Sequence, residues 1–286
     1  MKTILVPTDF SVASDSATQY AFHLAKNIGS DVILCHAVKI AMETPVAPQY
    51  GWVDYDGLKS DAVEELEVLS AALQEIPVHE NRKPVVEHIC EIGSLTDIIK
   101  VQACKQDIPL LVMGTSGAGS LSRFFLGSTS RDLIDAYILP TLLVPANAVF
   151  SKIRKIAFAT DMSRGDAELI AKVAELAKHF EAEILIVNIT DNRFNEFAYE
   201  QKADEFLKAV SERTAYSEIY FRHLLNDHIS EGLYQLTESG MVDMIVMVHR
   251  RHDLLDQIFK GSQSQKMARR SKIPLLVFPP VCKSEF

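Results

Sequence analysis

Glycine and hydroxyl residues are concentrated in one stretch of the chain, GTSGAGSLSRFFLGSTS at residues 114–130. The apolar run before Gly114 has the character of a buried strand, and residues 127–130 directly precede a segment with helical spacing. The free amides and the dipole of a helix N-terminus favour an anion, and glycine lets the backbone approach a ligand closely. The stretch therefore fits a phosphate-binding loop, although a turn with a helix cap accounts for the same residues.

The spacing of these residues differs from that of two common phosphate-binding motifs. No Lys-Ser or Lys-Thr pair follows Gly127, as the Walker motif requires. Ser122 occupies the last glycine position of a G-x-G-x-x-G motif that would begin at Gly117. A phosphate site in this stretch is therefore of another kind.

The segments around this stretch alternate between strands and helices. Short runs of Val, Ile and Leu predict strands that are buried on both faces, and the segments between them have helical spacing. We expect one helix between an N-cap at Ser11 and Gly29, and two more over residues 60–76 and 94–106. This alternation predicts an α/β fold with a doubly wound open parallel sheet, which binds ligands at the carboxyl ends of its strands.

The chain contains the same pattern twice. KTILVPTDFS at residues 2–11 returns as RKIAFATDMS at residues 154–163. LGSTSRDLIDAYILPTLLVP at residues 126–145 returns as KGSQSQKMARRSKIPLLVFP at residues 260–279. Repetition of several segments in one order predicts two copies of one domain in tandem.

We place the first domain at residues 1–147 and the second at residues 152–286, with a short linker at 148–151. The last strands of the two copies would expose their edges if each copy stood alone. We therefore expect the two domains to pack together as an intramolecular pseudo-dimer. A homodimer of the whole chain stays open.

The positions of the glycines resemble the nucleotide signature of the universal stress protein family. Gly114 and Gly117 are followed after nine residues by Gly127-Ser128, and the segments VPTDFS, DVILCHAV and LPTLLVP also resemble the family. The resemblance implies an adenine-nucleotide α-hydrolase-like fold that binds ATP with Mg²⁺ and acts in stress response or regulation. The nucleotide-binding residues that it implies are Pro7, Thr8, Asp9, Ala37, Met113, Gly114, Gly117, Gly127, Ser128, Thr129 and Ser130.

The resemblance also implies a role for each group of these residues. Residues 7–9 would border the adenosine, with Asp9 as the polar anchor, and Ala37 would meet the adenine through its backbone. Residues 113–117 would line the ribose and first phosphates, and residues 127–130 would hold the outer phosphates with Mg²⁺ bridging. Asp9 has an alternative role, since an aspartate at a strand end often caps the following helix.

The second copy lacks the glycines of this signature. Aligning HRRHDLLDQIFKGS with the first copy places His249 and His252 at the positions of Gly114 and Gly117, which argues against ATP in the second domain. If His228, His249, His252 and Asp161 open onto one cleft, they could hold Zn²⁺, and the neighbouring arginines could hold an anion. An empty, solvated cleft in a structural domain is the simpler interpretation.

Composition limits the classes of partner. The chain is 48% apolar and 23% charged, which is typical of a soluble globular protein, and its net charge of −9 argues against nucleic-acid binding. No apolar run approaches the roughly 18 residues of a membrane span, and the apolar run near the start is too short for a signal peptide. We therefore expect a cytoplasmic protein that contacts neither nucleic acid nor membrane. The cysteines form no C-x-x-C pair and are expected to pack without chemistry: Cys35, Cys90, Cys104 and Cys282.

Three kinds of function are compatible with these patterns. An ATP-binding regulatory or stress-response protein agrees best with the signature in the first copy. A slow ATP hydrolase or an adenylyl-transfer enzyme on the same fold is the alternative, but neither first strand is followed by H-x-G-H and no lysine or carboxylate pair marks a phosphoryl-transfer site. The third is an interaction module that binds no nucleotide. We expect no enzyme, or at most a slow ATPase.

Overall fold

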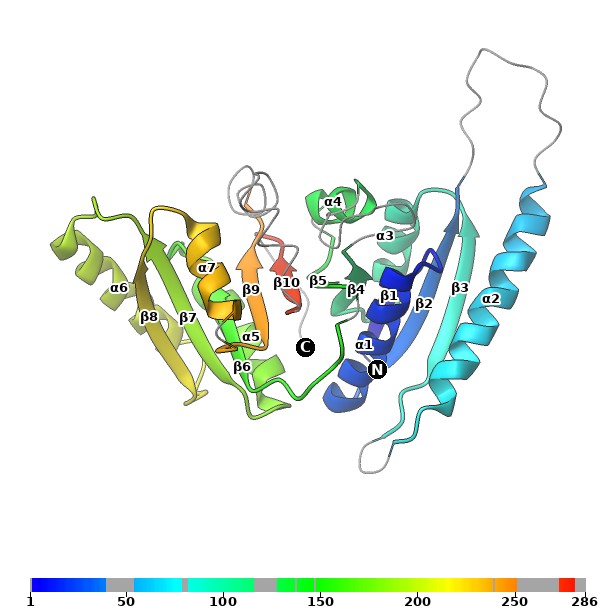
Figure 1. Cartoon of the computed structure of the whole chain (residues 1–286), viewed down its shortest axis with the longest axis horizontal. Coiled ribbons are helices and arrows are strands. Elements are labelled where there is room, and N and C mark those ends of the chain that lie inside the picture. Colours follow the sequence, from blue (N-terminus) through cyan, green and yellow to red (C-terminus); the bar gives the residue numbers. More distant parts are fainter. Residues whose placement is uncertain are drawn as a thin grey trace, which may run out of the picture.

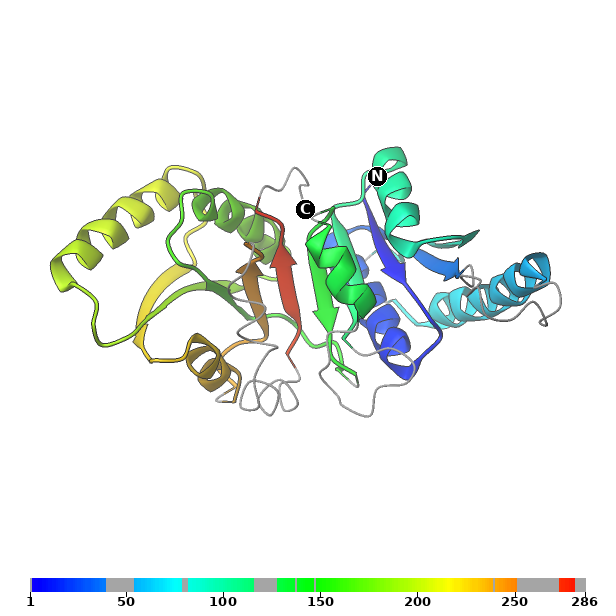
Figure 2. The same ribbon diagram turned by 90° about the horizontal axis from the view of Figure 1, so that it is seen from above.

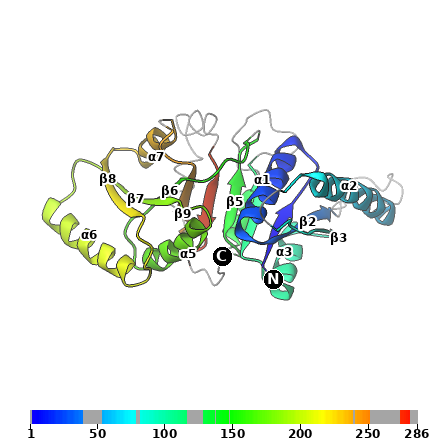
Figure 3. The same cartoon turned by 90° about the horizontal axis from the view of Figure 1, so that it is seen from below.

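The structure is a computed structural model of the whole chain. It describes residues 2–39, 54–78, 82–115, 128–136, 138–146, 148–238, 240–250 and 273–280, without the side chains of residues 128, 230 and 238. Figure 1 shows an elongated molecule in which the two halves of the chain lie side by side. The helices α2 and α6 mark its opposite ends in Figures 1 and 3.

The first half of the chain alternates strands with helices, as its apolar pattern predicts. Its elements are β1 (Thr3–Pro7), α1 (Val12–Ile28), β2 (Asp31–Val38), α2 (Tyr55–Glu75), β3 (Val86–Ile92), α3 (Leu95–Lys105), β4 (Leu110–Gly114), α4 (Ser128–Asp135) and β5 (Thr141–Val144). The strand β1 is buried at every position, which is the pattern of a strand covered on both faces of a sheet.

The second half repeats the alternation. Its elements are β6 (Lys155–Ala159), α5 (Asp166–Lys178), β7 (Glu183–Thr190), α6 (Glu196–Ser211), β8 (Ile219–Leu225), α7 (Ile229–Glu238), β9 (Met244–Val248) and β10 (Leu275–Phe278). The α/β fold with an open, mostly parallel sheet is therefore confirmed, and the alternation occurs twice along the chain.

The two halves share one sheet. Its ten strands follow the order β3-β2-β1-β4-β5-β10-β9-β6-β7-β8. All pairs are parallel except β5 and β10, which run antiparallel with Leu143 opposite Leu275. Figure 2 shows these two strands side by side in the middle of the molecule. The last strand of each half is thus paired within the chain and presents no free edge there.

Helices cover both faces of the sheet. One hydrophobic cluster joins the sheet to α1, α2, α5 and α6, and a second joins the other face to α3, α4 and α7. Each cluster contains residues from both halves, so the core is continuous across the β5–β10 junction. Such covering on both faces is the doubly wound arrangement.

The ends of α1 agree with the sequence prediction. The Ser11 side chain accepts a hydrogen bond from the Ser14 backbone N–H, and Gly29 ends the helix with a left-handed φ of 71°. The sequence prediction that α2 starts at residue 60 is wrong, since this helix begins at Tyr55. Asp54 caps it by accepting from the Gly57 N–H at 2.9 Å. A Cβ on Gly57 would lie 2.5 Å from the Asp54 carboxylate, so this glycine admits the cap instead of breaking the helix.

The segment that joins the halves is held by aromatic side chains. Phe150 lies with its ring centroid 5.0 Å from Tyr20 and 5.7 Å from His23, both on α1. It also lies 6.4 Å from Phe180, which follows α5 in the second half. The ring of Phe150 therefore ties the connection to both halves.

Within the described parts of the chain, no helix combines the length and apolar character that crossing a membrane requires.

Candidate functional site

The carboxyl edge of the first half has the geometry of a binding edge. The chain runs outward from β1 to β2 and β3 on one side, and returns to β4 and β5 on the other. β1 thus has β2 and β4 as its neighbours, and the strand order reverses between β1 and β4. Open α/β sheets bind ligands in the crevice outside the strand ends at such a switch point.

A tight turn follows β1 at this edge. The buried hydroxyl of Thr8 donates to Ser14 Oγ at 3.1 Å and accepts from the Phe10 N–H at 3.0 Å. Asp9 is exposed, and its carboxylate accepts from the Ser11 N–H at 3.2 Å. Phe10 takes a left-handed φ of 58° to complete the turn. Asp9 therefore supports the start of α1 and also presents its side chain at the switch point.

His36 secures this turn from β2. Its Nδ1 lies 2.8 Å from the Thr8 carbonyl oxygen, and its ring stacks on Phe10 with centroids 4.7 Å apart. Since a carbonyl only accepts, Nδ1 carries the proton. Ala37 follows in β2 and is half-buried at the same edge. His36 is not among the site residues predicted from the sequence.

Gly114, the last residue of β4, lies against the start of α1. A Cβ at this position would stand 2.6 Å from the Ala13 carbonyl oxygen and 2.7 Å from its carbon. From the sequence, this glycine is expected to let a ligand approach the backbone. The structure gives a different reason, because the backbone of α1 occupies the space that a side chain would need.

Thr115 follows Gly114 and is 3% exposed. Its backbone N–H donates to the Val144 carbonyl, but its hydroxyl has no hydrogen-bond partner among the residues that the structure describes. Buried hydroxyls are normally paired, so an orphaned one at a binding edge indicates a ligand or an ordered water. Met113 is buried beside it in β4.

Helix α4 begins at Ser128, as the sequence predicts for the residues after Gly127. Thr129 is half-buried and Ser130 is 4% exposed in its first turn. Gly117 and Gly127 lie outside the described residues.

The structure places the ends of β2, β1 and β4 together at one edge of the sheet.

The second half builds the same turn with other side chains. The Thr160 hydroxyl donates to Asp166 Oδ2 at 2.5 Å and accepts from the Met162 N–H at 2.8 Å. Asn188 takes the place of His36, since its Nδ2 donates to the Thr160 carbonyl at 2.7 Å. Residue numbers differ by 152 between the copies here, so Asp166 stands where the first half has Ser14.

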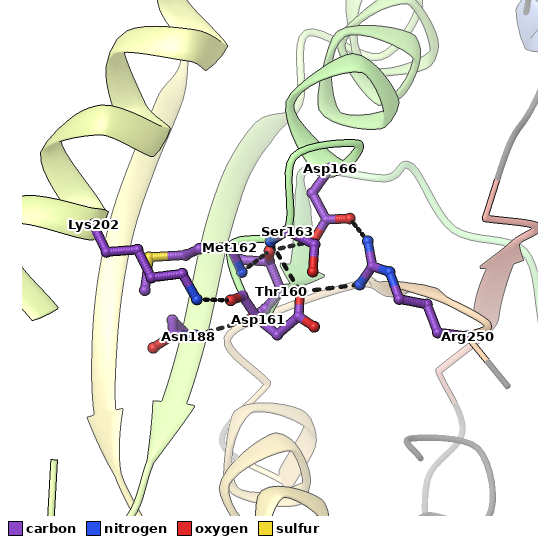
Figure 4. Close-up of polar contacts among 8 residues, drawn as sticks. All are labelled: Thr160, Asp161, Met162, Ser163, Asp166, Asn188, Lys202 and Arg250. Atoms are coloured by element: carbon purple, nitrogen blue, oxygen red, sulfur yellow. Dashed lines mark hydrogen bonds and ion pairs between the residues drawn. The ribbon is translucent and has the colours of Figure 1, made fainter. Parts of the chain in front are cut away.

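A cation of the chain itself lies at the carboxyl edge of the second half (Figure 4). Arg250, two residues beyond β9, places its guanidinium between two carboxylates of the turn after β6. One nitrogen lies 3.0 Å from Asp161 Oδ1, and the other bonds Asp166 Oδ1. Lys202 of α6 also donates to the Asp161 carbonyl at 2.7 Å. Arg250, Asp161 and Asp166 are therefore engaged with one another.

Asp166 is the buried member of this group. Its side chain has no exposed surface, and burial raises its pKa, while hydrogen bonds from Thr160 and Arg250 act in the opposite direction. A buried carboxylate without a cation would be costly. Arg250 thus compensates a charge that the first half, with Ser14 at this position, does not have.

Sequence comparison gives the two halves a common family. A profile described as "Universal stress protein family" matches residues 1–145 and again residues 152–279. The chain belongs to the universal stress protein family.

Individual relatives agree with this assignment. A universal stress protein of Methanocaldococcus jannaschii is 27% identical over 146 residues, which are 50% of this chain and 81% of that protein. The crystal structure of a universal stress protein from Archaeoglobus fulgidus aligns over 98% of both chains with a TM-score of 0.71 and 18% identity. The likeness to the solved structure shows that the fold extends over both halves.

The alignment of the two copies in this universal stress protein needs a correction of one residue. Ile4 of β1 pairs with Leu110 of β4, and the equivalent Ile156 of β6 pairs with Met244 of β9. Residue 114 therefore corresponds to Val248, and Thr115 corresponds to His249. A match between apolar residues does not by itself fix the alignment of two strands. An error of one residue in that alignment matters, because it assigns every side chain to the opposite face of the sheet.

The corrected register changes the interpretation of the second copy in this universal stress protein. Val248 and Arg251, not His249 and His252, stand at the positions of the first two signature glycines. Helix α5 begins at Asp166, two positions later than α1 begins in equivalent numbering. The later start of α5 is consistent with Val248 at the end of β9. In the first half, the equivalent Gly114 at the end of β4 lies against the first turn of α1.

The predicted histidine cluster does not assemble among the described residues. His249 Nε2 lies 2.8 Å from Asp135 Oδ1 of α4, in the first half of the chain. His228 is exposed, and its backbone N–H donates to Asn226 Oδ1. In the parts of the chain that the structure covers, no three His, Cys, Asp or Glu side chains are grouped to hold a metal ion. His252 lies outside those parts.

Proposed function

We propose that this universal stress protein binds one adenine nucleotide, ATP with Mg²⁺, in a domain formed by residues 1–147. The second domain, residues 152–286 beyond a linker at 148–151, is closed by its own residues and serves as a structural or recruiting partner. The two domains act as the halves of a pseudo-dimer within one chain, and a homodimer of the whole chain is compatible with this arrangement. The protein is a regulator in stress response and not a metabolic enzyme.

The observation that carries the proposal is the orphaned hydroxyl of Thr115. It is buried at the switch point of the sheet, next to the last residue of β4, and no residue that the structure describes satisfies it. The equivalent edge of the second half also contains a buried atom without a described partner, Asn188 Oδ1, but there Arg250 joins Asp161 to Asp166 across the turn. The two copies thus differ at the place where an α/β sheet receives its ligand.

The remaining residues of the first half suit the parts of an adenine nucleotide. Asp9, exposed beside Pro7 and Thr8, can accept from nucleoside hydroxyls, and the backbone at Ala37 lies at the end of the neighbouring strand. Met113, Gly114 and Thr115 end the strand on the other side. A nucleoside across these ends would meet β2, β1 and β4.

Hydroxyl groups and a helix start suit the phosphates. Ser128, Thr129 and Ser130 form the first turn of α4, and the signature glycines Gly117 and Gly127 precede it in sequence. Mg²⁺ is usually held through phosphates, water and one or two protein oxygens, so it needs no dedicated group of carboxylates. Hydroxyls of this turn would complete its coordination when the nucleotide is bound.

Binding without rapid turnover is the activity that this edge supports. Asp9 is the carboxylate that the described turn after β1 presents, and it already caps the start of α1. A general base that activates water needs a position and a pKa matched to that task. We therefore assign the site to nucleotide binding, with at most slow hydrolysis of ATP.

Titration calorimetry with Mg-ATP tests the proposal through a matched pair of variants. Asp9→Asn and Asp161→Asn change equivalent positions in the two halves, and each amide can still accept from the backbone N–H that follows it. We expect one nucleotide per chain, about tenfold weaker binding for Asp9→Asn and unchanged binding for Asp161→Asn. Two nucleotides per chain, or equal effects of both variants, would contradict the assignment to the first half.

A further inference from the structure

One described contact joins the carboxyl edge of the second half to helix α4 of the first. His249 Nε2 donates to Asp135 Oδ1 at 2.8 Å. A carboxylate can only accept, so Nε2 carries the proton. The His249 side chain is 13% exposed, whereas the Asp135 side chain is 56% exposed, so the imidazole is the more firmly enclosed partner.

The length and the charges of helix α4 make this contact important for its stability. It is eight residues long, and helices of that length are marginal without tertiary contacts. Asp135 is its last residue, where the negative end of the helix dipole disfavours a carboxylate, and the last turn contains no basic side chain. Leu133 and Ile134 bury the inner side of the helix. His249 supplies the donor that Asp135 needs at the outer end.

The other end of the contact is fixed to the sheet of the second half. The His249 N–H donates to the Phe278 carbonyl of β10 at 2.8 Å. The next residue, Arg250, is bound to Asp161 and Asp166. His249 therefore reaches α4 from a backbone that is held on both sides.

We propose that His249 is a positioning residue for the nucleotide site of the first domain. By holding Asp135, it fixes the direction of α4, and with it the direction in which the first turn of α4 faces the phosphates. The inference rests on the proposed function, because it concerns the phosphate end of that same site. In this proposal the second domain contributes to nucleotide binding through His249, which is equivalent to Thr115 of the first half.

We therefore expect that removing the His249 imidazole lowers the affinity for ligands that carry phosphates. ATP reaches the first turn of α4, whereas adenosine ends at the strand edges. His249→Ala should weaken ATP about fivefold and leave adenosine unchanged, a size typical of indirect effects on a binding site. His249→Gln retains a donor near the position of Nε2 and should restore ATP binding.

Calorimetry on the full chain with Mg-ATP and with adenosine makes the test. Asp135→Asn should also weaken ATP relative to Asp132→Asn, which removes the same charge from an exposed residue of the same helix. The double variant His249→Ala/Asp135→Asn should bind ATP no more weakly than His249→Ala alone. These variants lie at the surface end of a helix, so the asparagine pair remains informative if His249→Ala folds poorly.

The possible failures can be told apart. Wild-type protein that binds neither ATP nor adenosine overturns the proposed function itself. Wild-type protein that binds ATP, with His249→Ala and Asp135→Asn equal to their controls, overturns the positioning role alone. Equal weakening of ATP and adenosine also overturns it, because the effect would then be a general loss of structure.

Discussion

Removing the guanidinium of Arg250 should destabilise the protein by an amount that grows with pH. Arg250→Met keeps most of the aliphatic side chain but leaves the fully buried Asp166 with Thr160 as its remaining side-chain donor. Breaking a fully buried ion pair typically costs about 3–5 kcal/mol, because a buried charge is left uncompensated. Arg250 is 29% exposed and water can partly replace it, so we expect about 2–3 kcal/mol at pH 8.

The sign of the pH dependence follows from the Asp166 pKa. Burial already raises this pKa in the folded protein, so the unfolded chain gives up the proton more readily. The resulting penalty is absent below the pKa of an unfolded aspartate and is complete above the folded pKa. Loss of Arg250 removes a hydrogen bond and a charge that lower the folded pKa, so the penalty increases and extends to higher pH. The variant should therefore lose less stability at pH 5 than at pH 8.

Chemical denaturation of the full chain, followed by far-ultraviolet circular dichroism at both pH values, measures this loss. Arg193→Met is the matched control, because Arg193 pairs with Asp191 at a side chain that is 88% exposed, and it should change little. Asp166→Asn combined with Arg250→Met should recover most of the stability, since no buried charge is left. Equal midpoints for wild type and Arg250→Met, or a loss that does not change with pH, would refute the reasoning.

Two further predictions concern other parts of the molecule. Phe150→Ala should lower the free energy of unfolding by about 2 kcal/mol, because the half-buried ring packs on Tyr20 and His23; denaturant midpoints measure this, and Phe150→Leu should recover part of the loss. Iodoacetamide should alkylate the exposed Cys104 well before Cys35, because burial raises the pKa of the Cys35 thiol to about 12; peptide mass spectrometry over time checks the order, and equal rates would contradict it.

Features that depend on neighbouring residues could be predicted from the sequence. Ser11 and Gly29 mark the ends of α1 because a cap hydrogen bond and a left-handed φ are requirements of the local backbone. The end of β4 at Gly114 and the start of α4 at Ser128 follow in the same way from apolar spacing and helix-start residues. The ends of β1, β2 and β4 lie at one edge of the sheet, as the sequence predicts.

Features that depend on distant contacts could not be predicted. Gly114 is required by the backbone at Ala13, and His249 finds its partner 114 positions away in Asp135. The bridging role of Arg250 depends on its contact with the buried Asp166, 84 positions earlier in the chain. Sequence spacing shows which residue types are present at a strand end, but packing decides what each of them touches.

The covalent joining of β5 and β10 in one chain has a consequence for how such a protein can evolve. In a dimer of identical chains, every substitution appears in both subunits, so a change that fills one binding edge fills the other as well. Here the antiparallel junction is formed by two separately encoded strands. Arg250 can therefore occupy the edge of the second half, while the first half has Ser14 at the position of the buried Asp166. Two copies of the domain in one chain can thus change independently of each other. The two copies are nevertheless always present in equal numbers and always paired through the shared sheet.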